Sequence, residues 1–283
     1  MKLIWLKPYL VVAFLLLLTA DASALGFALL PKDEKPNGLL FGGVTIVALF
    51  IAIAVHELGH LLTGLAQGFR FELFIVGLLG IKREDGRIKV YFNKDLGMMG
   101  GVAATMPVQQ SAENRKKFAR LVIAGPLASL FFGVAGILIA IYCSQGLARG
   151  FWTVAGACSL ALVLATTLPT KTGIFFTDSA RYQRLISKGK AGAIEEAMLA
   201  MMAQYTVDNS AKNIDIEHAR LLQTDDEKFM RFWGYYYEYY YYKDNLLIAE
   251  AAEAKEKLVA EKSSVSNQIW KALKIDDNVT TAG

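Results

Sequence analysis

Two histidines four residues apart carry the clearest chemical signal in this chain. The run HELGH at 56–60 puts His56 and His60 on one face of a helix, because positions i and i+4 lie one above the other. Two imidazoles so placed can bind one Zn²⁺, and Glu57 beside them can take a proton from a water on the metal. Bound zinc lowers the pKa of water toward neutrality and polarises a carbonyl group. The motif therefore predicts a zinc hydrolase site.

A catalytic zinc ion needs a third protein ligand. The one further histidine, His218, lies far along the sequence, so we expect a carboxylate. Asp178 follows the last apolar segment, in a stretch that Pro169 interrupts, and non-helical backbone at membrane depth is tolerated where it lines a cavity. We predict Asp178 as the third ligand; its alternative role is an N-cap before Ser179. Other acids lie closer to the motif in sequence, but they belong to a charged loop, where solvation or ion pairing accounts for their presence. These acids are Glu72, Glu84, Asp85 and Asp95.

The segment that carries HELGH is long and apolar enough to cross a membrane. Between Gly38 and Phe69 its only ionisable side chains are those of His56, Glu57 and His60, and about 20 apolar residues suffice to span a hydrocarbon core. Ionisable groups at membrane depth are costly and usually functional. The alternative is structural, with the histidines bonding only to neighbouring helices.

Composition and the distribution of apolar residues predict the fold class. With 54% hydrophobic and 20% charged residues, the chain is too apolar for an ordinary soluble domain. We predict an all-α polytopic membrane protein with about four transmembrane helices, a β-rich cytoplasmic loop and a C-terminal helical soluble domain. Residues 1–187 would form the membrane-embedded catalytic domain and residues 188–283 the cytoplasmic helical domain. The predicted spans are Leu10–Leu30, Gly38–Phe69, Phe118–Cys143 and Phe151–Leu168.

Basic residues predict the orientation in the membrane. The predicted outer connections hold only Lys32, Lys35 and Arg149. By the positive-inside rule, we expect a multi-pass protein of the cell membrane with its N-terminus and C-terminal domain in the cytoplasm. The net charge of +4 is small and forms no basic stripe, which argues against nucleic acid as a partner. The central loop holds Arg70, Lys82, Arg83, Arg87, Lys89, Lys94, Arg115, Lys116 and Lys117.

Two segments permit more than one interpretation. The small residues Ala22-Ser23-Ala24 resemble a signal-peptide cleavage site, whereas apolar continuation to Leu30 favours a retained helix, which we expect. In the central loop, 69–76 and 87–92 are β-rich around a turn at 84–87, which predicts a hairpin. The following residues, Gly97–Met106, either dip into the membrane interface, line a substrate channel or form a surface loop.

The C-terminal region has helical periodicity. Apolar residues recur at spacings of three and four in Ala193–Tyr205, Phe229–Tyr242 and Leu246–Val259, which indicates paired antiparallel helices. The aromatic run within the second segment has a faint similarity to a tetratricopeptide hairpin, and we interpret it as a packing core rather than a peptide-binding groove. This domain is the place where we expect a regulatory protein to bind.

The segment from Gly38 to Arg184 resembles the site-2 protease family of intramembrane zinc metalloproteases. The resemblance rests on HELGH inside an apolar span, on AGPLAS at 124–129 in the next, and on Pro169 followed by TDSAR at 177–181. It implies a three-helix catalytic core and membrane-embedded protein substrates, often regulators whose release alters transcription. It also implies zinc bound by His56, His60 and Asp178, with Glu57 as the catalytic acid and base.

Three positions depart from the family pattern. Ser129, Thr166 and Ser179 stand where the family usually has Asn, Asn and Gly. These departures favour an alternative, a catalytically inactive membrane scaffold that acts through its C-terminal helices. Another alternative, a zinc transporter or metal sensor, would need histidines along several spans, which the sequence lacks. Because HELGH is complete, we predict a zinc metalloendopeptidase that lies in the lipid bilayer and cleaves membrane-embedded proteins.

Overall fold

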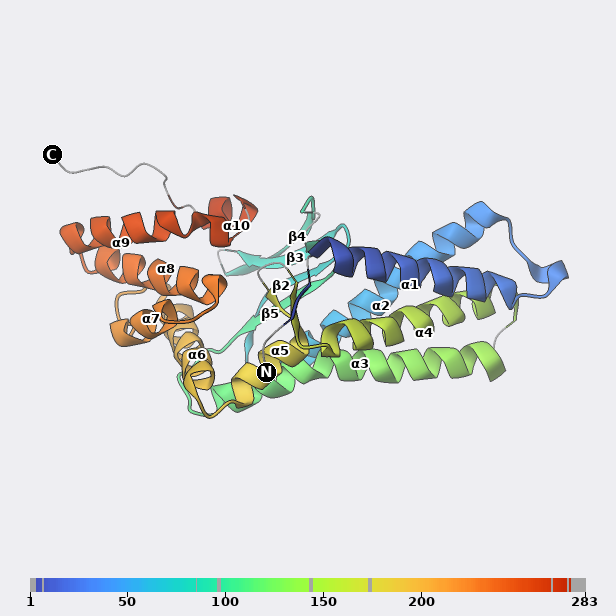
Figure 1. Cartoon of the computed structure of the whole chain (residues 1–283), viewed down its shortest axis with the longest axis horizontal. Helices are drawn as coiled ribbons and strands as arrows, with labels where there is room; N and C mark the ends of the chain where they lie inside the picture. Colours follow the sequence, from blue (N-terminus) through green and yellow to red (C-terminus); the bar gives the residue numbers. More distant parts are fainter. Residues whose placement is uncertain are drawn as a thin grey trace. The chain divides into compact units, whose positions relative to one another are not determined.

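Helices make up most of the described chain (Figure 1). The computed structural model describes residues 4–6, 8–84, 86–95, 98–142, 145–172, 175–265, 267–273 and 275. The chain divides into two compact units, which we call the membrane unit and the C-terminal unit. The membrane unit comprises Met1–Gln67, Phe71–Thr105 and Arg120–Tyr182; the C-terminal unit comprises Gly68–Arg70, Met106–Ala119 and Gln183–Gly283.

The four predicted spans coincide with four helices. These are α1 (Pro8–Ala28), α2 (Gly38–Ala66), α3 (Asn114–Tyr142) and α4 (Gly146–Thr167). Among the described residues, α2, α3 and α4 are long and apolar enough to cross a membrane, and α1 contributes a shorter apolar stretch, Leu16–Ala28. The polytopic membrane character is therefore supported, while the fourth crossing and the retention of α1 stay predictions.

Helix α2, which carries HELGH, has a defined signal at each end. The Asn37 side chain accepts a hydrogen bond from the Leu40 amide at 2.8 Å, which caps the first turn. The helix ends at Ala66, and Gly68 follows with φ +84°, a left-handed conformation that glycine adopts without strain. At about 1.5 Å per residue, its 29 residues extend about 44 Å, more than a hydrocarbon core of about 30 Å.

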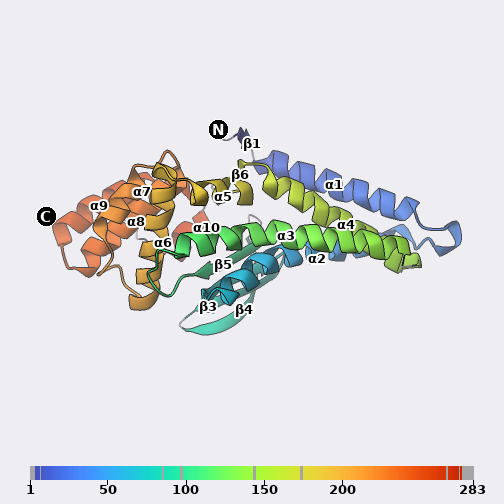
Figure 2. The same cartoon turned by 90° about the horizontal axis from the view of Figure 1, so that it is seen from below.

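Small residues bring the membrane helices close together. Helix α4 packs against both α1 and α2, and Figures 1 and 2 show it running alongside α1. Ala48 and Ala52 of α2 and Val154 of α4 are completely buried in the shared apolar core. A Cβ atom at Gly156 of α4 would lie only 2.9 Å from the carbonyl oxygen of Gly133 in α3. Such close backbone approach is typical of helix packing in membranes.

The loop between α2 and α3 forms a sheet, partly as predicted. Strands at 70–76 and 87–92 and the turn between Glu84 and Arg87 are confirmed. The turn joins the strand at 87–92 to a strand at 79–84 that was not predicted, so the expected direct pairing of 69–76 with 87–92 is wrong. Asp85 and Gly97 lie outside the described residues. The sheet order is β4-β3-β2-β5, with β2 Arg70–Val76, β3 Leu79–Glu84, β4 Arg87–Phe92 and β5 Val102–Met106.

A second, small sheet lies in the segment after α4. Strand β6 (Thr170–Thr172) pairs in parallel with β1 (Ile4–Leu6) and antiparallel with β7 (Phe175–Phe176). The chain after Pro169 is therefore extended rather than helical, as proline and the following polar residues favour. This segment leads directly into helix α5 (Asp178–Ile186).

The C-terminal unit is a series of packed helices. The three predicted helical segments are confirmed as α6, α8 and α9, while α7 was missed because eight residues are too few to show periodicity. Consecutive helices pack in series, α6 on α7, α7 on α8 and α8 on α9. Their bounds are α6 Lys190–Asp208, α7 Ile216–Gln223, α8 Lys228–Asp244, α9 Ile248–Ala260 and α10 Asn267–Ala272; the 3-10 helices are η1 Lys32–Glu34 and η3 Lys262–Ser264.

Aromatic side chains of α8 form the centre of this unit, as interpreted from the sequence. Phe232 is fully buried, Tyr236 and Tyr237 are nearly so, and the rings of Phe232 and Trp270 lie 6.2 Å apart. Burial, which disfavours the charged phenolate, raises the pKa of Tyr240 to about 12. These tyrosines therefore stay neutral and act in packing.

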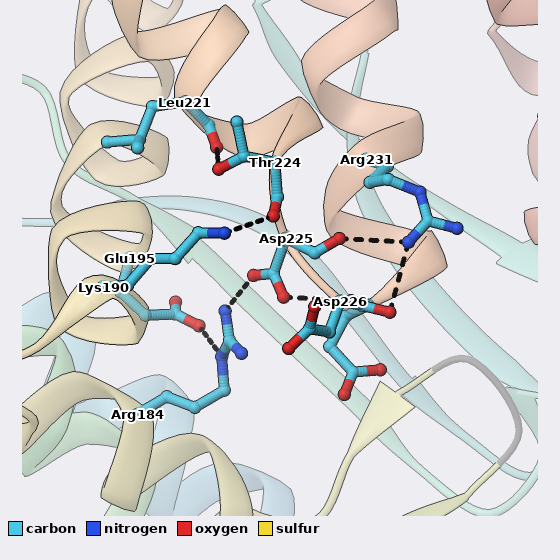
Figure 3. A network of polar contacts seen from close by, with 9 residues as sticks. Arg184, Lys190, Glu195, Leu221, Thr224, Asp225, Asp226 and Arg231 are labelled. Atoms are coloured by element: carbon cyan, nitrogen blue, oxygen red, sulfur yellow. Dashed lines mark hydrogen bonds and ion pairs between the residues drawn. The ribbon is translucent and has the colours of Figure 1, made fainter.

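A buried ionic network links three segments of the C-terminal unit (Figure 3). The Arg184 guanidinium near the end of α5 donates to the Glu195 carboxylate of α6 at 2.7 Å and also to the Asp225 carboxylate. Glu195 is fully buried and Asp225 almost so. Arg231 of α8 donates to the Asp225 carbonyl at 3.0 Å. Each charge is partnered, which buried charges require.

Candidate metal centre

The three residues predicted as ligands lie together in the membrane unit. His56 and His60 project from one face of α2, and Asp178 is the first residue of α5. The distance from His56 Nε2 to Asp178 Oδ2 is 3.2 Å, and that from His60 Nε2 to Asp178 Oδ1 is 3.5 Å. The two Nε2 atoms are 3.3 Å apart. These three residues form a group that could hold a metal ion.

The outer nitrogen of each imidazole has a partner on α3. His60 Nδ1 lies 2.9 Å from the Leu121 carbonyl oxygen, which can only accept, so Nδ1 carries the proton and Nε2 presents a lone pair to the group. His56 Nδ1 lies 2.9 Å from the Ser129 hydroxyl. Metal-bound histidines typically have their second nitrogen held in this way. Contacts from α3 to the two Nδ1 atoms therefore fix the orientation of both imidazoles.

The donor set fits a zinc ion. A tetrahedral Zn²⁺ with bonds of about 2.0–2.1 Å separates its ligand atoms by about 3.3–3.4 Å. The two Nε2 atoms are 3.3 Å apart, and each lies 3.2–3.5 Å from one oxygen of Asp178, His56 from Oδ2 and His60 from Oδ1. With one ligand atom from each residue, all three atoms lie within 4.8 Å of one another, which is compatible with one shared ion. Asp178 Oδ2 is buried and has no hydrogen-bond partner in the part of the chain that the structure describes. A buried carboxylate oxygen that faces an imidazole lone pair calls for a cation between them.

Glycines let α3 come within reach of α2. A Cβ atom at Gly125 would lie 2.2 Å from His60 Nε2, and one at Gly59 would lie 2.6 Å from the Ala124 carbonyl oxygen. Neither position can therefore carry a larger residue without moving a helix or an imidazole. The AGPLAS segment at 124–129 thus supplies one wall of the group.

Glu57 lies beside the ligands and against the chain that leads into β5. It is only 8% exposed. A Cβ atom at Gly101, whose φ is +106°, would lie 2.6 Å from Glu57 Oε1, and the Ala103 backbone hydrogen-bonds to the same carboxyl group. Strand β5 and this approach to Glu57 contradict a bland surface loop for the described part of 97–106. The interface and channel interpretations stay predictions. The glycines of this stretch are the sequence signal that could have indicated such an approach, because glycine allows positive φ and close backbone contact.

The segment before Asp178 is tied back to the end of α4. The Thr177 hydroxyl donates to the Leu168 carbonyl at 2.7 Å, which places Asp178 at the start of α5. Gly173 and Ile174 lie outside the described residues. Thr166 Oγ1, at one departure from the family pattern, is buried with no hydrogen-bond partner among the described residues.

Among the described residues, the other candidate acids and the third histidine are not part of the group. Glu84 pairs with Lys89 at 2.9 Å and Lys82 at 3.3 Å, and hydrogen bonds from these lysines hold the pKa of Glu84 below its usual value. His218 lies in the C-terminal unit, 3.8 Å from Asp215. Asp178 is thus the one described carboxylate that joins the two histidines.

An HExxH motif on an apolar helix, with a later aspartate beside its histidines, is the arrangement expected of a membrane metallopeptidase. The chain belongs to Peptidase family M50, the site-2 protease family, whose family model matches residues 44–280. The matched region includes HELGH and Asp178. Neither curated proteins nor solved structures gave a match. Family membership supports an intramembrane metalloprotease kind of function.

Proposed function

We propose that this protein is an intramembrane zinc metalloprotease that hydrolyses peptide bonds of membrane-embedded proteins. The observation that carries the proposal is the convergence of His56 and His60 of the apolar helix α2 with Asp178 at the start of α5, with polar atoms 3.2–3.5 Å apart. Glu57 is adjacent in sequence and nearly buried. Zn²⁺ held by these three residues would lower the pKa of a water molecule and polarise the scissile carbonyl.

Glu57 has the proton-transfer role in this proposal. Its carboxylate removes a proton from the attacking water as the water oxygen bonds to the carbonyl carbon. The same proton then passes to the amide nitrogen as the carbon–nitrogen bond breaks, so the carboxylate is regenerated. The backbone of Gly101 confines the carboxyl group on one side. A substrate helix must unwind locally, because an intact helix hides its carbonyls in hydrogen bonds.

The membrane orientation and partners follow the same proposal. The central loop with its basic residues would face the cytoplasm, with the N-terminus and the C-terminal unit on the same side. A regulatory protein that binds the C-terminal helices stays a prediction. The orientation is tested with two single-cysteine variants, Lys89→Cys and Lys35→Cys, and a membrane-impermeant thiol reagent. In intact cells the cysteine at 89 should be protected and the cysteine at 35 should be labelled.

The function is tested with Glu57→Gln and Asp178→Ala in the full chain. Zinc content is measured by elemental analysis, and cleavage with a panel of single-span test proteins whose helices contain Gly or Pro. Glu57→Gln should keep its zinc and lose cleavage, whereas Asp178→Ala should lose both. Wild-type protein that binds zinc and cleaves none of the panel would favour the inactive scaffold. Equal zinc in the Asp178→Ala protein would remove that residue from the site.

A further inference from the structure

We propose that Ser129 is a positioning residue of the metal centre, whose hydroxyl oxygen accepts a hydrogen bond from His56 Nδ1–H and so leaves the Nε2 lone pair free to bind the metal. The inference rests on the proposed zinc site. It assigns a role to a residue that the sequence comparison marked only as a departure. The contacts of Ser129 that support this role join α2, α3 and α4 inside the membrane unit.

The contact is short and fully enclosed. Ser129 Oγ lies 2.9 Å from His56 Nδ1, and Ser129 is completely buried. The Ser159 hydroxyl of α4, also completely buried, donates to the Ser129 backbone carbonyl at 2.9 Å and does not contact the Ser129 side chain. Water cannot readily replace the hydrogen bond between Ser129 Oγ and His56 Nδ1, so the orientation of His56 depends on the Ser129 hydroxyl.

The two histidines are held by different chemistry. The Leu121 carbonyl can only accept a hydrogen bond, so it leaves His60 a single tautomer. A hydroxyl can either donate or accept a hydrogen bond, so contact with Ser129 is compatible with both neutral tautomers of His56. If Ser129 donated, the His56 proton would sit on Nε2 and point at Asp178 Oδ2, 3.2 Å away. That tautomer has no lone pair for a metal.

Metal binding therefore requires Ser129 to accept. The hydroxyl then needs an acceptor for its own proton, and a serine inside a helix commonly gives it to the carbonyl four residues earlier, here that of Gly125. Asparagine, the residue more usual at this position in the family, also offers a side-chain oxygen as acceptor. Serine thus keeps the side-chain oxygen that can accept a hydrogen bond from His56. Its presence at position 129 therefore gives no support to an inactive scaffold.

The test measures zinc affinity rather than cleavage. Full-length Glu57→Gln protein in detergent serves as the parent, so that self-cleavage plays no part. Its zinc dissociation constant is determined by competition with a chromogenic chelator and compared with those of Ser129→Ala, Ser129→Asn and Ser159→Ala made in the same background. Ser159→Ala is the matched control, since it removes an equally buried hydroxyl that contacts no imidazole.

We expect Ser129→Ala to weaken zinc binding by about 10–100-fold, as loss of a residue behind a metal ligand usually does. Ser129→Asn should restore most of the affinity, and Ser159→Ala should change it by less than about threefold. At saturating Co²⁺, the visible absorption spectrum of Ser129→Ala should differ from the parent's, because His56 is no longer held; general loss of stability would not alter it.

Three results would overturn the inference. These are equal zinc affinity in the parent and Ser129→Ala, equal losses in Ser129→Ala and Ser159→Ala, and an asparagine variant as weak as the alanine variant. A different failure identifies the proposed function itself as wrong: a parent protein that binds no zinc. The two failures are therefore distinguishable in one titration.

Discussion

Replacement of Gly125 by alanine should damage the metal centre from the neighbouring helix. The added Cβ would lie 2.2 Å from His60 Nε2 and 2.4 Å from its Cε1 atom. Non-bonded atoms of this kind prefer separations of about 3.5 Å, so His60 or α3 must move by about 1.3 Å. Metal–ligand distances tolerate about 0.2 Å. The imidazole can therefore no longer bond as it does in the parent.

Gly125→Ala should affect both zinc affinity and folding stability, and the two losses can be compared. Zinc affinity should fall by more than about 100-fold, since disturbing a residue behind a ligand already costs about 10–100-fold. Overpacking costs about 1–3 kcal/mol of stability, against a gain of about 1 kcal/mol for alanine over glycine in a helix. Net destabilisation of the metal-free protein should therefore stay below about 2 kcal/mol, so the zinc defect exceeds the folding defect.

The assay is zinc titration of Gly125→Ala alongside Gly42→Ala. A Cβ atom at Gly42 in α2 meets nothing within 4 Å, so this control adds the same methyl group to open space. It should bind zinc like the parent and be slightly more stable. If Gly125→Ala bound zinc with the affinity of Gly42→Ala, the close approach of α3 to His60 would be refuted.

Two further predictions use matched pairs. In Gly101→Ala the backbone is strained at φ +106° and the new Cβ points at Glu57 Oε1, so cleavage should fall by more than about tenfold while zinc content stays unchanged. The control is Gly100→Ala, whose Cβ meets nothing within 4 Å and which should be normal in both measurements. Arg184→Ala, which removes the guanidinium that pairs with the buried carboxylates of Glu195 and Asp225, should lower the free energy of unfolding of the full chain in urea by about 3–5 kcal/mol. Arg220→Ala, at an exposed pair with Glu217, is the control and should lower it far less.

The elements that could be predicted are those with local signals. A long apolar segment makes α2 a membrane helix whatever surrounds it, and the spacing of His56 and His60 puts them on one face without knowledge of the fold. Asp178 was chosen because zinc needs a third ligand and because helix breakers precede this residue. The structure brings its carboxylate within 3.5 Å of both imidazoles. That they hold zinc stays a prediction.

The features that were missed depend on contacts between distant residues. Strand β3 has the sequence LGIKRE, in which three charges obscure any alternation, and it becomes a strand through pairing with β2 and β4 on either side. The approach of Gly101 to Glu57 joins positions whose proximity depends on the sheet. Ser129 and His56 are 73 residues apart, so substitution of the usual asparagine could not be interpreted before the contact was known.

Those contacts show that HELGH and the AGPLAS helix are two halves of one structure. The residues of α3 that contact the histidines are Leu121, Gly125 and Ser129, spaced four apart and so aligned on one face of that helix. The first accepts from His60, the second has no side chain where His60 passes, and the third contacts His56. Four-residue spacing on α3 thus repeats the four-residue spacing on α2. Two helices matched in this way can hold both imidazoles only in one axial register, and a shift of one residue between them would break all three contacts.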